Sequence, residues 1–257
     1  MGAMDYVSSL FNLEGRVGII TGATRGLGMG IAKVLTDAGA TVYNLSRSPR
    51  SNDEDITGNM IDVLLDITDK EAVKAKVLEI VEKESHLDFL VNNAGMQYQC
   101  RAEELDEEHF LMIENTNQNA VFNNSCICYT YLKESKHVGR IINISSMAGH
   151  LGFSGVVPYC MTKHGVIGLT KGLAEEWKKD NILVNSIAPG WFMTKLTTEQ
   201  YAKDPARGNR AKQKIMLGDY GKPVEIGYMA LFLLSEASKY ITGQDFAVDG
   251  GALVHGY

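Results

Sequence analysis

The chain has 257 residues, a formal net charge of -6 and a pI near 5.6. With 45% hydrophobic and 22% charged residues, its composition is that of a globular protein able to bury a sizeable core. The acidic balance argues against a nucleic-acid partner, which would call for a basic face, and no apolar run is long enough to span a bilayer. We therefore expect a cytoplasmic protein with neither a nucleic-acid nor a membrane partner.

The amino terminus and the cysteines carry no predicted function. Residues 1–12 are expected to be an N-terminal extension or a remnant of expression, followed by one domain over 13–257. The cysteines form no Cys-x-x-Cys pair and have no histidine at metal-ligand spacing. We expect free thiols, and neither a disulfide framework nor a metal site, at Cys100, Cys126, Cys128 and Cys160.

A strand, a glycine-rich turn and a helix open the domain. The apolar run 15–20 leads into the turn 21–28, and helical spacing continues to Gly39. Glycines let the backbone approach a pyrophosphate and let the helix direct free amide groups at it. A plain strand-to-helix turn is the alternative, and the pattern is T-G-x-x-x-G-x-G rather than G-x-G-x-x-G. The turn residues expected to bind a dinucleotide are Gly22, Thr24, Arg25, Gly26, Leu27 and Gly28.

The second predicted strand, 41–45, ends in Ser46-Arg47-Ser48. In a dinucleotide fold, an acid at this strand end binds the ribose 2′-hydroxyl of NAD, whereas an arginine accepts the 2′-phosphate of NADP. The acid is missing here and Arg47 is present, with Arg25 able to reach the same phosphate. We therefore favour NADP(H) over NAD(H), with Ser46 and Arg47 at the phosphate. The alternative is that these arginines are solvated surface charges.

Strands and helices alternate through the rest of the chain. Strands are expected at 59–68, 87–91, 140–144, 182–188 and 245–251, and helices at 70–85, 103–112, 115–133, through Tyr159 to Trp177, and 223–234. This order predicts an α/β fold, a single-domain Rossmann-like doubly wound parallel sheet of about seven strands with helices on both faces. Residues 191–217 show no clean periodicity and are expected to be a mobile substrate loop.

Tyr159 and Lys163 stand four residues apart on one predicted helix, so both side chains leave the same face. A neighbouring ammonium favours phenolate, so Lys163 is expected to lower the pKa of Tyr159 toward neutrality. Tyr and Lys at this spacing also occur by chance, so the interpretation depends on the surrounding motifs. His164 faces elsewhere on the helix and is interpreted as a packing or surface histidine.

Together these motifs resemble the short-chain dehydrogenase/reductase family from about Leu13 to Gly251. The turn 21–28 resembles the cofactor turn of that family, Asp66 its adenine-contacting acid, and 92–95 its central-strand motif. Pro189-Gly190 with Thr194 resembles the segment that holds the nicotinamide carboxamide. The resemblance therefore adds a second group of cofactor-binding residues: Asp66, Ile67, Asn93, Ala94, Gly95, Tyr159, Lys163, Pro189, Gly190 and Thr194.

The resemblance also implies a catalytic tetrad of Asn117, Ser146, Tyr159 and Lys163. Tyr159 would donate a proton to a substrate carbonyl oxygen, Ser146 would hold that oxygen, and Lys163 would tune Tyr159 and bind the nicotinamide ribose. Asn117 would relay protons through a water. Where the family commonly has small residues between Tyr and Lys, this chain has Cys160-Met161-Thr162.

Trp191 and Phe192 are candidates for the substrate site, where they would join Ser146 and Tyr159. An equal alternative is that they anchor the segment 191–217.

Within the family, the stretches 11–15, 174–177 and 187–192 resemble the gluconate 5-dehydrogenase type. This resemblance implies an NADP(H)-dependent oxidoreductase acting on a carbonyl or secondary alcohol of a sugar acid such as gluconate or 5-ketogluconate. The alternative is a 3-oxoacyl-carrier-protein reductase, whose acidic carrier would need a basic patch, and a remote alternative is a non-catalytic NADP-sensing protein. Basic residues for such a patch, or for a sugar-acid carboxylate, are Lys195, Lys203, Arg207, Arg210, Lys212 and Lys214.

The long helices that begin near Asn117 and Tyr159 would suit contacts between subunits. Family members are usually homotetramers or dimers, so we expect a homo-oligomer.

Overall fold

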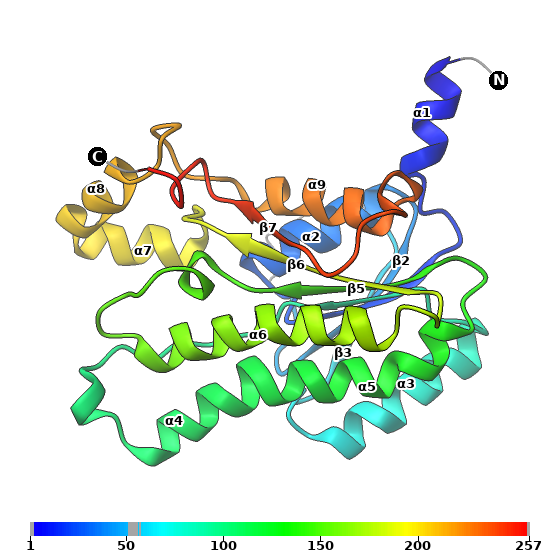
Figure 1. Cartoon of the computed structure of the whole chain (residues 1–257), viewed down its shortest axis with the longest axis horizontal. Helices are drawn as coiled ribbons and strands as arrows, with labels where there is room; N and C mark the ends of the chain where they lie inside the picture. Colours follow the sequence, from blue (N-terminus) through cyan, green and yellow to red (C-terminus); the bar gives the residue numbers. More distant parts are fainter. Residues whose placement is uncertain (1–2, 51–55, 57, 256–257) are drawn as a thin grey trace.

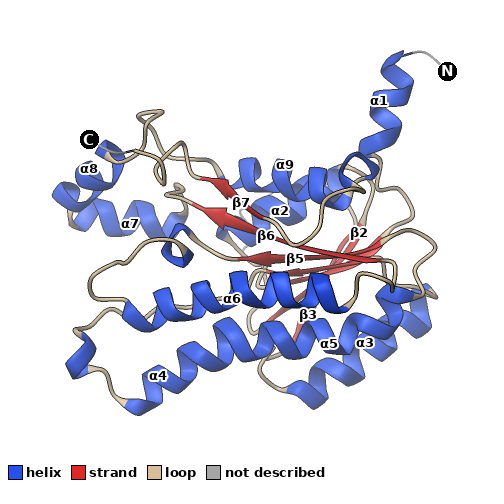
Figure 2. Ribbon diagram, in the orientation of Figure 1, coloured by secondary structure: helices blue, strands red, loops and turns tan. Residues whose placement is uncertain are grey.

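The computed structural model describes residues 3–50, 56 and 58–255, and within them seven strands form one parallel sheet. The strand order is β3-β2-β1-β4-β5-β6-β7, which reverses between β1 and β4, where sheets of this class bind ligands. The doubly wound α/β fold expected from the sequence is confirmed (Figure 2). The strands are β1 (Val17–Thr21), β2 (Thr41–Ser46), β3 (Met60–Leu64), β4 (Phe89–Asn92), β5 (Gly139–Ile144), β6 (Ile182–Pro189) and β7 (Asp245–Val248).

Helices cover both faces of this sheet (Figure 1). Ile20 and Val42 point to the core beneath α2 and α9, whereas Ile19 and Tyr43 point to the core beneath α3, α5 and α6. Burial on both faces explains why the strands read as nearly continuous apolar runs. The packed helices are α2 (Gly26–Asp37), α3 (Lys70–Glu84), α5 (Ala120–Lys133), α6 (Val157–Glu176) and α9 (Pro223–Leu234).

The two helices expected at 103–112 and 115–133 form one nearly continuous stretch. A 3-10 turn, η1 (Ala102–Glu104), precedes α4 (Glu107–Glu114), and a single π-helical turn, η2 (Asn115–Asn119), joins α4 to α5. Asn117 lies within this π turn, fully buried. Isolated π turns are often found at functional sites because the extra residue redirects a side chain.

Residues 191–217, expected to be a mobile substrate loop because they lack a clean periodicity, contain two helices, α7 (Lys195–Lys203) and α8 (Pro205–Gln213). Asp204 begins α8, since its carboxylate accepts a hydrogen bond from the Arg207 backbone N–H at 3.0 Å. Apolar residues are too sparse in α8 to give a helical period. Both helices lie beyond the arrowheads of β6 and β7 (Figure 1).

The amino-terminal segment was expected to be an extension of the domain. Residues 3–11 of it form helix α1 (Ala3–Phe11), which projects from the end of the molecule opposite α8 (Figure 1). Residues 1 and 2 lie outside the described part. None of the helices described is both long and apolar enough to cross a bilayer.

Candidate active site

The turn between β1 and α2 is a cradle that side chains would fill. Gly22 has φ +71°, a left-handed conformation suited to glycine, and an added Cβ would lie 3.0 Å from the Ala94 Cα. A Cβ on Gly28 would lie 2.5 Å from the Gly22 carbonyl oxygen. Both positions therefore require glycine for close packing.

The β4 end fixes the shape of this turn. The Asn93 side-chain amide donates to the Thr21 and Gly22 carbonyls at 2.9 and 3.0 Å, and the Thr21 hydroxyl accepts from the Asn93 and Ala94 backbone N–H groups at 3.0 Å each. The Asn93 side chain and the Ala94 backbone N–H are thus committed to the turn itself. We expected these two residues at the cofactor, and the structure gives them this bracing position.

A residue that sequence reasoning missed, Asn44 in β2, connects the turn to the neighbouring strand. Its side-chain oxygen accepts from the Ala23 N–H at 2.8 Å and from the Ser46 hydroxyl at 2.6 Å. Asn44 and Ser46 are both buried, so the Ser46 hydroxyl faces inward. A buried amide within an apolar strand was the signal that could have identified Asn44.

Asp66 follows β3 and accepts hydrogen bonds from the Thr68 backbone N–H and hydroxyl at 2.9 and 2.8 Å. Partial burial acts to raise the pKa of Asp66, but the Thr68 hydrogen bonds and the positive charge of Arg47 outweigh it and lower that pKa. Asp66 and Arg47 therefore lie close together at the end of the sheet that would hold an adenosine. Ile67 beside them is buried, whereas Arg25 and Arg47 are exposed.

These residues fit a dinucleotide. Arg25 occupies the N-cap of α2 without a side-chain capping hydrogen bond, so the first amide groups of α2 are not used by a cap. An added Cβ at Gly26 would lie 3.6 Å from the Thr194 Cγ2, so the segment after β6 comes down on the same turn. At the β6 end, the Gly190 N–H donates to the Val248 carbonyl at 3.0 Å. Pro189, which precedes Gly190, is the last residue of β6.

Helix α6 carries Tyr159 and Lys163 to the carboxyl edge of the sheet. The Lys163 ammonium is buried, donates to the Ile144 carbonyl at 2.7 Å, and lies 5.6 Å from the centre of the Tyr159 ring. Burial lowers the pKa of Lys163 to about 8, because a charged ammonium is disfavoured away from water.

Tyr159 differs from expectation in its titration. Burial raises the pKa of Tyr159, while the nearby Ser146 hydroxyl acts in the opposite direction and does not overcome it. We expected Lys163 to hold this pKa low. In the protein alone the desolvation of the phenol dominates, because both groups of the pair are withdrawn from water.

Ser146 lies two residues after β5 and is the N-cap of the short turn η3 (Met147–Gly149). Its hydroxyl accepts from the Ala148 N–H at 3.1 Å, which fixes the side-chain rotamer. The turn packs closely on α6, since a Cβ on Gly149 would lie 2.9 Å from the Lys163 carbonyl oxygen. This close approach brings Ser146 beside Tyr159.

Asn117 connects the π turn η2 to the same group of residues. Its amide accepts from the Met96 N–H at 2.8 Å, donates to the Met96 carbonyl at 2.8 Å, and donates to the Thr162 hydroxyl at 3.2 Å. A Cβ on Gly95 would lie 3.3 Å from the Asn117 oxygen and 3.6 Å from the Lys163 ammonium. These contacts pin the loop after β4 to α6, and the proton relay expected of Asn117 stays a prediction.

The two aromatic candidates for the substrate site, Trp191 and Phe192, lie in different surroundings. Trp191 is half-buried and meets the Phe153 ring edge-on, with ring centres 6.3 Å apart. Phe192 is 6% exposed and belongs to the core beneath α2 and α9, where it packs on Gly221. The assignment of Phe192 to the substrate site was therefore wrong, whereas Phe153, which sequence reasoning missed, faces Trp191.

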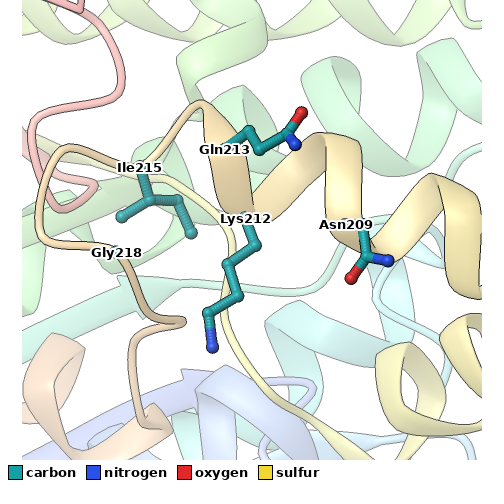
Figure 3. A pocket seen from close by; sticks show the side chains of 5 residues that line it. All are labelled: Asn209, Lys212, Gln213, Ile215 and Gly218. Atoms are coloured by element: carbon teal, nitrogen blue, oxygen red, sulfur yellow. The ribbon is translucent and has the colours of Figure 1, made fainter.

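An open hollow lies elsewhere, along α8 and the turn that follows it (Figure 3). The predicted tetrad contributes none of the five residues that line it, and its Lys212 is paired with Asp219 at 3.2 Å. The candidate active site is therefore defined by Ser146, Tyr159 and Lys163 and not by this hollow. Across the described residues, no cluster of three or more histidine, cysteine or acidic side chains is placed to hold a metal ion.

A glycine cradle at the switch point, with a half-buried phenol and a buried ammonium beside it, is the arrangement of a dinucleotide-dependent oxidoreductase. The chain belongs to the short-chain dehydrogenase/reductase family, since a family model described as Enoyl-(Acyl carrier protein) reductase matches residues 22–253. It is accordingly an oxidoreductase acting on a CH–OH group.

Individual relatives extend over nearly the whole chain. A 2-dehydro-3-deoxy-D-gluconate 5-dehydrogenase of Bacillus subtilis is 36% identical, covering 97% of this chain and 99% of the relative. A 3-oxoacyl-[acyl-carrier-protein] reductase of Thermotoga maritima is also 36% identical, covering 94% and 99%. The solved gluconate 5-dehydrogenase of Burkholderia cenocepacia, in complex with NADP and tartrate, superposes with a TM-score of 0.88 at 30% identity, covering 96% of this chain and 99% of that one.

Proposed function

We propose that the protein is an NADP(H)-dependent dehydrogenase that interconverts a secondary alcohol and a carbonyl on a sugar acid, such as gluconate and 5-ketogluconate. The observation that carries the chemistry is the placement of the Ser146 hydroxyl near the Tyr159 phenol, beside the buried Lys163 ammonium. The sugar-acid substrate is supported by similarity to the Bacillus and Burkholderia proteins.

The cofactor would lie across the switch point. The turn from Gly22 to Gly28 would take the pyrophosphate, Asp66 and Ile67 the adenine, and Pro189, Gly190 and Thr194 the nicotinamide end. When bound, the nicotinamide supplies or accepts the hydride, and the protein supplies orientation and protons.

Tyr159 would act as the general acid in the reduction direction. Its raised pKa keeps the phenol protonated at neutral pH, so that a proton is available as negative charge develops on the substrate oxygen. Ser146 would donate a hydrogen bond to that same oxygen and fix its position. The Lys163 ammonium, beside the ring, would stabilise the phenolate that remains.

Asn117 would act by position in this scheme. It holds Met96 and Thr162 and thereby sets the distance between the loop after β4 and α6. Lys163 and Gly95 meet at that contact, so the ribose side of the nicotinamide would be shaped there.

The preference for NADP(H) rests on Arg25 and Arg47. Both are exposed at the end of the sheet where a 2′-phosphate would lie, and a planar guanidinium binds a doubly charged oxyanion through paired N–H donors. Arg47 lies near enough to Asp66 to lower its pKa, so the adenosine end combines an acid with a basic rim.

The substrate is tested by comparing turnover of 5-ketogluconate with that of an acetoacetyl thioester, both with NADPH. We expect kcat/KM to be at least about tenfold higher for the sugar acid, which corresponds to about 1.4 kcal/mol in transition-state binding. The second candidate function, a 3-oxoacyl-carrier-protein reductase, is favoured by the Thermotoga relative at the same identity. A preference for the thioester would replace the sugar-acid assignment and leave the reaction class unchanged.

We also propose a cytoplasmic homo-oligomer, a tetramer or a dimer. Helices α5 and α6 lie side by side (Figure 1) and expose Phe122 and Met161, which are 48% and 44% accessible. Apolar side chains of this size on adjacent helices suit a subunit contact. Light scattering coupled to gel filtration gives the molar mass, and a monomer at micromolar concentration would contradict the proposal.

A further inference from the structure

The α7–α8 segment bridges the two sides of the candidate site. At its beginning, Thr194 lies against Gly26 of the cofactor turn. At its far side, the Arg207 guanidinium donates to the Gln99 side-chain oxygen at 3.2 Å. Gln99 belongs to the loop that follows β4. The segment therefore runs from the cofactor side to the opposite rim of the site.

The Gln99 loop is tied to the catalytic residues at both ends. It starts at Gly95, where an added Cβ would lie 3.6 Å from the Lys163 ammonium. Further along, the Cys100 N–H donates to the Gly155 carbonyl at 3.0 Å, and a Cβ on Gly155 would lie 3.5 Å from the Gln99 Cγ. Gly155 stands just before α6, the helix of Tyr159. Arg207 is therefore linked, through Gln99 and Gly155, to the start of the helix that carries Tyr159.

The partner of the Arg207 guanidinium is a neutral amide oxygen. The nearest carboxylate along the helix, Asp204, already accepts the Arg207 backbone N–H as the cap of α8. Lys212, five residues beyond Arg207 on the same helix, is by contrast paired with Asp219. A guanidinium presents a fork of N–H donors that matches a carboxylate in two parallel hydrogen bonds, and such a charge-assisted pair is stronger than a bond to an amide.

We propose that Arg207 binds the carboxylate of the substrate at the rim of the site, exchanging its hydrogen bond to Gln99 for a bidentate pair with the anion. This assignment rests on the proposed sugar-acid function and deepens it. Binding through Arg207 anchors the acid end of the molecule, so that a carbonyl several carbons away is presented to Tyr159 and Ser146. Arg207 is a specificity-determining residue in this scheme and takes no part in proton transfer.

The test is calorimetric titration of the NADP⁺-loaded protein with gluconate and, as a second anionic probe, with tartrate. Arg207→Ala is expected to weaken gluconate binding about 10- to 100-fold, the effect of losing a charge-assisted pair, while NADPH affinity stays within about twofold. Gln99→Glu is expected to weaken gluconate binding as well, because the new carboxylate would pair with the Arg207 guanidinium. Gln99→Ala removes the docking contact and keeps the charge, so it is expected to retain gluconate binding.

Arg101→Ala is the matched control, since Arg101 is an exposed arginine beside the same loop and pairs with Glu103. It is expected to leave both anions within about twofold of the wild-type affinity. If Arg207→Ala retains the affinity for both anions as Arg101→Ala does, the role proposed for Arg207 is wrong. If gluconate does not bind while tartrate binds in an Arg207-dependent way, the sugar-acid function fails and the anion site stands; absence of Arg207-dependent binding for both overturns the inference.

Discussion

The cofactor turn and the α7–α8 segment lie at the same edge of the sheet but are held in opposite ways. The turn is fixed by buried hydrogen bonds from Asn93 and Asn44 and by glycines with no room for a Cβ. The α7–α8 segment depends on a helix cap at Asp204 and on exposed polar contacts such as Arg207–Gln99. Changes in the turn therefore disturb fold and cofactor together, whereas changes in the segment are free to alter recognition alone.

The same division separates the residues that would carry out the reaction from those that would choose the substrate. Ser146 and Lys163 are buried between β5 and α6, so their positions follow from packing of the sheet. Trp191 and Phe153 meet across two loops that leave the sheet. We infer that the chemistry belongs to the rigid part of the molecule and the choice of substrate to the exposed part, and the following changes test that division.

The largest effect is expected from Tyr159→Phe. Removing the phenolic hydroxyl removes the general acid, which contributes about 10²- to 10⁴-fold to turnover. We expect kcat to fall by that factor while NADPH affinity, measured by fluorescence titration, changes less than about threefold. Tyr240→Phe, at an exposed tyrosine, is the control and is expected to be silent. Substantial residual turnover in Tyr159→Phe would show that Tyr159 is not the general acid.

The next effect concerns the rigid turn. In Gly28→Ala the new Cβ meets the Gly22 carbonyl, so the turn must shift, at a cost of about 1–3 kcal/mol in the free energy of unfolding. NADPH binding should weaken in parallel. Gly168→Ala on α6 is the matched control, because nothing lies within 4 Å of its Cβ, and it should stabilise the protein by about 0.5–1 kcal/mol. If Gly28→Ala and Gly168→Ala unfold at the same temperature, the turn is not fixed by steric contact.

The buried ammonium predicts a pH dependence in the cofactor-free protein. The pKa of Lys163 is about 8 in the folded chain against 10.5 for the ordinary side chain, so between these values the unfolded chain binds more protons. Stability from this group therefore rises as the pH increases from about 8 to 10.5, by an amount on the order of 1–3 kcal/mol. Lys163→Met should lack this rise. If the free energy of unfolding changes equally with pH in the wild type and in Lys163→Met from pH 7 to pH 10, burial does not set the pKa of Lys163.

The smallest effect is expected at the adenosine rim. Arg47→Ala removes one exposed guanidinium, and NADPH affinity should fall about tenfold because a charge-assisted hydrogen bond to phosphate is lost. NADH affinity should be unchanged, since it carries no 2′-phosphate. Titrations with both nucleotides side by side measure the ratio. An equal loss for NADPH and NADH would assign Arg47 to the shared part of the cofactor.

The contrast between the two regions also explains what the sequence could predict. The strands and the turn 21–28 were predictable because burial on both faces and glycine spacing leave local patterns. Helix α8 was missed because its apolar residues are few, although Asp204-Pro205 is a start signal that could have identified it.

Contacts between distant segments were not predictable from local patterns. The clamp of Asn117 on Met96 and Thr162 joins three segments, and the π turn that orients Asn117 has no local period. Phe192 was assigned to the substrate site together with its neighbour Trp191, whereas its side chain turns into the core, a direction that the local sequence does not report. The sign of the Tyr159 pKa shift depended on burial, which spacing does not report.

A crystal structure with NADP⁺ and gluconate bound tests the central claim most directly. The account predicts one gluconate hydroxyl oxygen within about 2.6–3.2 Å of both the Tyr159 and the Ser146 hydroxyls, with the acid end directed toward α8. Gluconate seated away from these two hydroxyls, for example in the hollow beside Lys212, would contradict it.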